Sequence, residues 1–473
     1  MASGARQSVT QQLAVEMANT AAEDIPEPAL AAIKRLFIDH LGIAYMGAAF
    51  VGKPLHDYAV ALGGAPEARL IGSGVSVPAE LAAAINSQMC RATDFEETGP
   101  GTHIGPLCVH TALAVGQREH ASGAEVLTAA ALGYLLCARF HFSRLKGWPR
   151  TSATQHRVTA AAITARLKGF DAASLARALS LAWELPPRTH QPSAPFGKKR
   201  ISPIASISGL GAPLFNARLG VQAAVLVGHG FESVLDEIDQ HLSDYDVDVL
   251  LSQPPPYHWI DGEMELKPWV SSRHCQCGLQ ALDNLIRRLR IDAAAVSAIR
   301  LHLSNMYTAR QGWLFEPAPD NYWEAIYSTQ WAAAMILQKI PAGPKWVTPE
   351  RLADPLSRRL AAMVEIIEDP AASRAYWGTD GVSLAAARGQ HGANWLDIAG
   401  TVEVEIDGQV YSERCTMRET FGSPGMDLTE SMVEGKFLEA TAPVLPRDRA
   451  RALLALARSV EDIVDISTLA AAM

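Results

Sequence analysis

The stretch PALAAIKRLFIDHLGIAYMG (residues 28–47) decides the fold class, because its apolar residues recur every three or four positions. That spacing is typical of the buried face of a helix. The same pattern occurs in GAEVLTAAALGYLLCARF (123–140), VTAAAITARLKG (158–169) and AASLARALSLAW (172–183). Many positions on these faces are Ala or Gly, which lets helices approach closely. The sequence therefore predicts a tightly packed, mainly α protein that is helical almost throughout from residue 7 to about 250.

The pattern changes at LSQPPPYHWIDGEMELKPWV (251–270), where three consecutive prolines interrupt any helix. Strand patterns follow at 298–304, 363–368 and 399–415, the last around an Asp-Gly turn, with helical stretches at 277–289 and 324–338. Helical periodicity returns after residue 428. We therefore expect a large all-helical domain formed by the N- and C-terminal segments (1–266 and 429–473), with an inserted smaller α+β domain (267–428).

Composition narrows the functional class. The chain has 473 residues, 48% of them hydrophobic, which suffices for large buried cores. A net charge of -9 without a Lys/Arg stripe argues against a nucleic-acid partner, so an anionic substrate would need a local cluster of cations. The six scattered cysteines are expected to be reduced thiols. We see no membrane span or export signal and expect a cytoplasmic protein.

Residues 93–111, TDFEETGPGTHIGPLCVHT, gather acids, a hydroxyl and a histidine around a Gly-Pro-Gly break. Asp94, Glu96 and Glu97 follow the helical run 79–89, so we expect them at the end of a helix that the break terminates. Carboxylates there oppose the helix dipole, and such a broken local rule favours a functional site. The alternative is an acidic, solvated helix end.

Several segments, in their order along the chain, resemble the MmgE/PrpD family, which includes 2-methylcitrate dehydratase, cis-aconitate decarboxylase and iminodisuccinate epimerase. The segments are LFIDHLGIAYMG (36–47), TDFEET (93–98), LKGFDAASLARALSLAW (167–183), LGVQAAVLVGHGFES (219–233) and KPWVSSR (267–273). The resemblance implies a metal-free helical domain with a smaller lid, often assembled as a homodimer. It also implies an active site between the two, which uses no cofactor and acts on small di- or tricarboxylates.

Carried over residue by residue, the family's catalytic acid, hydroxyl and histidine match Asp94, Thr98 and His103. Elsewhere the sequence departs from the family pattern. GWPRT (147–151) has Pro149 in place of a family histidine, and Trp331 replaces the tyrosine of the lid. The candidates for the missing histidines are His156 and, on the lid, His274. The family's lysine has no clean counterpart, so we expect the substrate-binding cations to be Lys198, Lys199, Arg200 and Arg273, although the first three also fit a solvated basic turn.

A proton next to a carboxylate is weakly acidic, so its removal needs a base and donors for the developing charge. His103 suits the base, with Asp94 fixing its tautomer, Thr98 donating to a substrate carboxylate and His274 as the second acid–base group. No His-x-x-x-His pair suggests a metal site. We expect a cofactor-independent lyase that dehydrates or decarboxylates a small anionic carboxylate through an α-carbanion. The alternatives are an isomerase or epimerase that uses the same proton abstraction, and a non-catalytic homologue that acts as a binding module.

Overall fold

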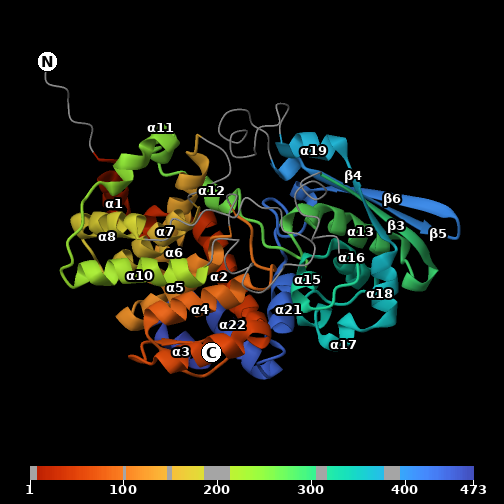
Figure 1. The fold of residues 1–473 in the computed structure, drawn as a ribbon, viewed down its shortest axis with the longest axis horizontal. Helices are drawn as coiled ribbons and strands as arrows, with labels where there is room; N and C mark the ends of the chain where they lie inside the picture. The colour runs from red at the N-terminus through yellow and green to blue at the C-terminus, as the bar shows by residue number, and fades with distance from the viewer. Residues whose placement is uncertain (1–7, 100–102, 146–151, 186–212, 305–316, 378–394) are drawn as a thin grey trace, which may run out of the picture.

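The structure is a computed structural model that describes residues 8–99, 103–145, 152–185, 213–304, 317–377 and 395–473. It is mainly helical, as the periodicity predicts. Figure 1 shows the N-terminal helices gathered on one side of the molecule and a four-stranded sheet with its own helices on the other. We call the first part the helical body (residues 8–262 and 430–473) and the second the sheet region (residues 276–416).

The helical body is built around α2 (Glu27–Gly47), which packs against helices from both ends of the chain. The apolar spacing of 28–47 makes this helix, and 15 of its residues are buried. The other helices of its N-terminal part are α1 (Val9–Asn19), α3 (Lys53–Leu62), α4 (Ala79–Arg91), α5 (Gly105–Glu119), α6 (Gly123–Phe142), α7 (Ser152–Leu167), α8 (Ala172–Glu184), α10 (Pro213–Gly228), α11 (Val247–Leu250) and α12 (His258–Asp261), with a two-stranded ladder of β1 (Ala68–Arg69) and β2 (Ser76–Val77).

The C-terminal helices return to this body. α21 (Glu430–Thr441) and α22 (Arg447–Arg458) pack on α2, and α23 (Ser467–Ala472) packs on α5. The Tyr45 hydroxyl donates to the carbonyl of Met473 at 3.0 Å, joining the two ends of the described chain. The body is therefore closed by segments more than 340 residues apart in sequence.

The sheet region has strand order β4-β3-β5-β6. β3 (Val296–Leu303) is parallel to β4 (Val364–Glu368) and antiparallel to β5 (Ala399–Ile406), which forms a hairpin with β6 (Gln409–Thr416). Asp407 and Gly408 turn the hairpin with φ of 51° and 75°, as a type I′ turn requires. The three strand predictions are confirmed. The helices of this region are α13 (Gln276–Leu289), α15 (Tyr322–Tyr327), α16 (Thr329–Leu337), α17 (Pro349–Leu352), α18 (Pro355–Ala362) and α19 (Pro370–Trp377).

The helix predicted over 324–338 is interrupted, and that prediction is wrong in detail. α15 ends at Tyr327 and α16 begins at Thr329. Ser328 between them has extended backbone, and its hydroxyl accepts from the N–H of Trp331. Serine favours such a cap over a helix interior because its side chain competes for backbone groups.

α6 is long and apolar enough to cross a membrane by length and composition alone. In this fold 89% of its most apolar window is buried inside the protein. A buried core helix passes the same length and composition test, so α6 is weak evidence for a membrane span.

Candidate active site

The acidic motif lies beyond the helix that precedes it. The sequence suggested that Asp94, Glu96 and Glu97 lie at the end of this helix. α4 ends at Arg91, so the three acids follow the helix and are not part of its last turn. The turn passes through Asp94 in the left-handed region with φ of 49°. All three carboxyl groups are buried, with residue exposures of 3%, 0% and 0%. The alternative of an acidic, solvated helix end is therefore wrong.

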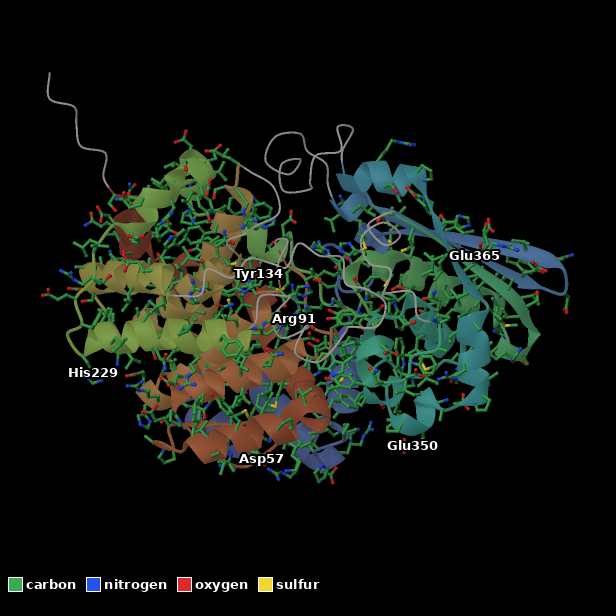
Figure 2. All side chains as sticks on the ribbon, in the orientation of Figure 1. Asp57, Arg91, Tyr134, His229, Glu350 and Glu365 are labelled. Carbon is green, nitrogen blue, oxygen red and sulfur yellow. The ribbon has the colours of Figure 1, made fainter. Side chains whose placement is uncertain are left out.

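Two buried cations neutralise these carboxylates. The Nη1 atom of Arg91 lies 3.1 Å from Asp94 Oδ1 and 2.9 Å from Glu96 Oε1. The Nζ atom of Lys267 lies 3.4 Å from Asp94 Oδ1 and donates to the Asp94 carbonyl at 2.8 Å. Figure 2 shows Arg91 near the middle of the molecule, between the helical body and the sheet region. We call Arg91, Asp94, Glu96, His103 and Lys267 the charge cluster.

His103 joins the cluster through Glu96. Its Nδ1 lies 2.7 Å from Glu96 Oε1, whereas Asp94 was expected to orient it. Asp94 instead pairs with Arg91 and Lys267, because both cations reach its carboxylate. The His103 side chain keeps 23% exposure, the most of any member of the charge cluster. A small molecule would therefore meet the cluster at this ring.

The surroundings of His103 and Glu96 set the protonation state of each group. Burial and the nearby Arg91 lower the pKa of His103, against the opposing effect of Glu96. Burial alone would raise the pKa of Glu96, but Arg91, Lys267 and the contact with His103 hold it well below its usual range. At neutral pH the arrangement is an ionised carboxylate beside a neutral imidazole, which can act as a base.

A second layer fixes the segments that carry the cluster. Lys436 on α21 pairs with Asp39 on α2 at 2.8 Å and lies 4.0 Å from the centre of the Phe95 ring. Its Nζ donates to the carbonyls of Lys267 at 2.8 Å and Phe95 at 3.2 Å. One buried ammonium therefore ties α2, α21 and both charged segments together.

Glu97 holds the other end of the His103 loop. Its Oε1 accepts from the N–H of Gly105, the first residue of α5, at 2.9 Å. Its Oε2 lies 3.0 Å from Nε2 of His40. A Cβ at Gly105 would stand 2.4 Å from Glu97 Oε2, so glycine permits this approach. Burial raises the pKa of Glu97, against the hydrogen bond from His40.

Thr98 is paired with a residue from the 251–270 segment. Thr98 and Glu265 exchange backbone hydrogen bonds of 2.9 Å and 3.0 Å as an isolated antiparallel bridge. Both residues are buried. Arg273, expected to bind substrate, has its Nε atom 3.5 Å from Glu265 Oε2, so a protein carboxyl group is its nearest described anion.

The remaining predicted residues have different surroundings. His274 belongs to the short 3-10 helix Arg273–Cys275 and His156 is buried in α7. Their roles stay predictions. Lys198, Lys199 and Arg200, like Pro149 and Trp148, lie outside the described residues. Trp331 is fully buried and its indole N–H donates to the carbonyl of Trp346 at 2.7 Å, which is a packing role.

Three groups in or beside the charge cluster were not predicted from the sequence. Arg91, Lys267 and Glu265 were not proposed as site residues, although Lys267 stood in the quoted KPWVSSR segment. The only sequence signal was their position, at the end of a helix and beside a domain boundary. Tyr327 was also not predicted. Its hydroxyl is close enough to Arg91 to act on the pKa of the guanidinium group. Burial lowers that pKa, whereas Glu96 and Tyr327 raise it. It offers a buried phenol four residues before Trp331.

Asp94, Glu96 and His103 also have the geometry of a metal site, because their ligand atoms all lie within 4.8 Å of one another. Arg91 and Lys267 stand against the same carboxylates, so two positive charges already fill the role that a divalent cation would have. Binding of a metal here would have to displace both. The donor set therefore fits a metal poorly.

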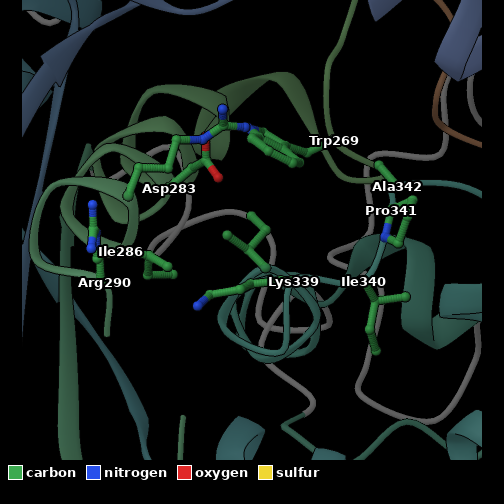
Figure 3. Close-up of a pocket in the computed structure, with 10 residues that line it drawn as sticks. Trp269, Asp283, Ile286, Arg290, Lys339, Ile340, Pro341 and Ala342 are labelled. Atoms are coloured by element: carbon green, nitrogen blue, oxygen red, sulfur yellow. The ribbon is translucent and has the colours of Figure 1, made fainter. Parts of the chain in front are cut away.

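Two pockets lie in and beside the sheet region. One of about 580 Å³ lies between α13 and the end of α16, with Trp269 and Lys339 among its lining residues (Figure 3). The other, of about 460 Å³, lies where Phe50 stacks on Tyr322 with ring centres 5.2 Å apart. No member of the charge cluster lines either pocket. The reactive groups therefore belong to a separate place in the fold.

Comparison with known proteins agrees with the resemblance found in the sequence. No curated protein matches the chain. The family model of the MmgE/PrpD N-terminal domain matches residues 11–247, and that of the MmgE/PrpD C-terminal domain matches residues 269–462. These two matches cover most of the described helical body and all of the sheet region, and the chain belongs to the MmgE/PrpD family.

Proposed function

We propose that this protein is a cofactor-independent dehydratase that removes water from a small di- or tricarboxylate through an α-carbanion. Family membership supports a dehydratase-type lyase. The observation that carries the proposal is the contact of 2.7 Å between His103 and the buried carboxylate of Glu96, beside Arg91 and Lys267. An oriented neutral imidazole removes a proton, and fixed cations stabilise the negative charge that develops.

The charges around the cluster favour an anionic substrate. Four basic side chains face five carboxyl groups, and burial raises the pKa of two of these, Glu97 and Glu265. Both shifts reduce the negative charge that faces the four basic side chains, so a substrate carboxylate would find partners among them. The groups counted are Arg91, Lys267, Arg273 and Lys436 against Asp39, Asp94, Glu96, Glu97 and Glu265.

In the proposed reaction Nε2 of His103 takes the proton from the carbon next to a substrate carboxylate. Glu96 accepts the hydrogen of Nδ1, which leaves the lone pair on Nε2. Arg91 and Lys267 stabilise the enolate-like carbanion. The carbanion's electron pair then forms the double bond as the carbon–oxygen bond to a β-hydroxyl breaks, and that hydroxyl leaves as water after it accepts a proton.

We also propose how the domains and subunits are arranged around this reaction. The sheet region would serve as a lid over the charge cluster. The chain would act as a homodimer in the cytoplasm, without a cofactor or metal, and its partner would be the small carboxylate substrate. Domain limits at residues 266 and 428 divide lid from body in this proposal.

The test is incubation of the full chain with citrate, methylcitrate, aconitate and iminosuccinate-type acids in deuterated water. Products and α-deuterium are followed by mass spectrometry and proton NMR. Loss of water with deuterium entering the remaining substrate is the expected result. Deuterium exchange with inversion and no loss of water would replace the dehydratase by an epimerase. Binding of an acid without either reaction would indicate a non-catalytic binding module.

A further inference from the structure

The isolated bridge between Thr98 and Glu265 brings two side chains to one side of the backbone. The two residues exchange both of their backbone hydrogen bonds, at 2.9 Å and 3.0 Å. Directly opposite residues of an antiparallel pair project their side chains to the same face, with neighbouring Cβ atoms. The hydroxyl of Thr98 and the carboxyl of Glu265 are therefore neighbours by construction.

These side chains lack the partners that buried polar groups normally have. Among the described residues, Thr98 Oγ1 and both carboxyl oxygens of Glu265 find no hydrogen bond, although both residues are at least 96% buried. Tyr134 on α6 is similar, and its buried hydroxyl also has no hydrogen-bond partner in the described part of the chain. Buried polar groups are nearly always hydrogen-bonded, so these groups are able to bind the polar groups of a ligand.

The Tyr134 hydroxyl lies beside Gly99, the next residue of the bridged segment. A Cβ built on Gly99, the residue after Thr98, would stand 1.6 Å from this oxygen. Gly99 therefore leaves room for the phenol beside the bridge. Figure 2 shows Tyr134 close to Arg91 in the projection, at the inner edge of the helical body. Successive residues of an extended segment point to opposite faces, so the Tyr134 hydroxyl lies on the Gly99 face, and the Thr98 hydroxyl and the Glu265 carboxyl group share the other.

The charged neighbours of Glu265 come from three segments. Arg273 lies 3.5 Å away, and Lys267 and Lys436 also act on the carboxyl group, while Cys277 on α13 is a nearby thiol. Burial outweighs the three cations and raises the pKa of Glu265 to about 7. A carboxyl group with this pKa holds its proton in a large share of molecules at neutral pH and can give it up there.

We propose that Glu265 is a second catalytic residue, the general acid that protonates the departing hydroxyl, with the Thr98 hydroxyl hydrogen-bonded to the same substrate group. This role rests on the proposed dehydration. His103 takes the α-proton, the carbon–oxygen bond breaks, and the hydroxyl leaves as water with the proton of Glu265. The Glu265 carboxylate and the His103 imidazolium then return to their starting states by net transfer of one proton.

This assignment gives Glu265 the role that the sequence suggested for His274. Hydroxide is a poor leaving group, so a dehydratase needs an acid beside it as well as a base at the α-carbon. The two roles call for groups whose surroundings push their pKa values in opposite directions from their ordinary values. Burial lowers the pKa of His103, which keeps the imidazole neutral and able to accept a proton, and raises that of Glu265, which keeps part of the carboxyl group protonated at neutral pH.

The experiment compares Glu265→Gln with the wild-type full chain on the acid that the panel identifies, in deuterated water. Glutamine keeps the shape and removes the transferable proton. Product formation should fall by about 10²–10⁴-fold, while α-deuterium exchange, which needs only His103, should persist. The alkaline limb of the wild-type pH profile of kcat with an apparent pKa near 7 should disappear. Glu263→Gln, the same change two residues earlier, is the matched control and should retain product formation.

Thr98→Val provides a second variant that removes one hydroxyl only. Its product formation should fall about tenfold, the effect of one hydrogen bond. Unchanged product formation in Glu265→Gln, or equal losses of exchange and product formation, would overturn the acid role. A wild-type protein that neither exchanges nor dehydrates any acid would instead overturn the proposed function, and the role of Glu265 with it.

Discussion

At the residue scale, the position of one hydrogen on His103 decides what the site can do. Glu96 lies 2.7 Å from Nδ1 and is held ionised by Arg91 and Lys267. An ionised carboxylate only accepts hydrogen bonds, so in the proposed mechanism Nδ1 carries the hydrogen and Nε2 keeps its lone pair. The same pairing would stabilise the imidazolium that forms after proton abstraction.

Glu96→Gln tests this orientation. The glutamine amide can donate to Nδ1, which would move the ring hydrogen to Nε2 and remove the base. We expect kcat to fall by about 10²–10⁴-fold with little change in KM, as for other carboxylates that orient a catalytic histidine. Steady-state kinetics measures this, with Glu80→Gln at the start of α4 as control. A variant that keeps wild-type kcat would show that Glu96 does not set the tautomer.

The raised pKa of Glu265 predicts how the free energy of unfolding depends on pH. Its pKa is about 7 in the folded protein against an ordinary 4.5, so the folded state binds the proton more tightly. The resulting stability is fully present below pH 4.5 and is lost as pH rises through 7. The difference of about 2.5 between the two values corresponds to about 3 kcal/mol at most.

Urea unfolding of the wild type and Glu265→Gln at pH 5 and pH 8 measures this effect. The variant carries no titrating group at this position. As pH rises, the free energy of unfolding of the wild type should therefore fall relative to that of the variant. Other titrating groups cancel in the comparison. Parallel pH dependences for the two proteins would show that Glu265 has an ordinary pKa.

Part of the site could be predicted from the sequence. Asp94, Thr98 and His103 were predicted together because they match the acid, hydroxyl and histidine of the family that the chain resembles, and the structure buries Asp94 and Thr98 and leaves His103 partly exposed. The pairing of Thr98 with Glu265, 167 residues later, leaves no local pattern. Asp94 was predicted to orient His103, but Glu96 contacts that histidine. The spacing of the acids in the sequence does not say which of them will pair with the cations Arg91 and Lys267.

At the element scale, α21 is bound to α2 and to the charged segments through Lys436. Its ammonium group contacts Asp39, the Phe95 ring and two backbone carbonyls. A cation in this position satisfies acceptors on three segments at once. The C-terminal helix therefore supports the charge cluster without contributing a reactive group to it.

Lys436→Met should destabilise the protein by about 3–5 kcal/mol, because it leaves the buried Asp39 carboxylate without its partner. Adding Asp39→Asn should recover part of that loss. Lys345→Met, which breaks an exposed pair with Glu439, should cost about 1 kcal/mol or less. Chemical denaturation measures all three. Equal effects of Lys436→Met and Lys345→Met would contradict the bridging role of Lys436.

Replacing a helical glycine by alanine should have opposite effects on stability at Gly105 and at Gly435. Gly105→Ala would place a Cβ 2.4 Å from Glu97 Oε2, so it should displace the carboxylate that anchors α5 and lower both stability and kcat. Gly435 on α21 has open space, so Gly435→Ala should stabilise by about 0.5–1 kcal/mol. Thermal unfolding compares the two. A neutral Gly105→Ala would show that the Glu97 anchor is dispensable.

Elements with strong local signals were predicted well. The 28–47 run became α2, and the Asp407-Gly408 turn became the β5–β6 hairpin, because periodicity and turn chemistry are local properties. The break between α15 and α16 was missed, since residues 324–338 keep an apolar pattern across Ser328. Whether a serine caps a new helix there is decided by the surrounding packing, which no short window contains.

At the scale of the whole molecule, the site is assembled from four distant parts of the chain. Asp39 on α2, residues 91–98 after α4, residues 265–267 and Lys436 on α21 all meet through buried ion pairs or backbone bonds. Such a network costs stability unless every member is paired. Its retention in a chain of net charge -9 agrees with a role in binding and transforming an anion.

The most direct test of the central claim is α-hydrogen exchange in deuterated water by the wild type, His103→Gln and the control His120→Gln, which changes an exposed histidine. Circular dichroism confirms that each variant is folded. We predict that the wild type and His120→Gln incorporate deuterium into the acid identified by the panel, and that His103→Gln loses this exchange by at least about 10²-fold. Exchange at the wild-type rate in folded His103→Gln would contradict the claim that this imidazole removes the proton.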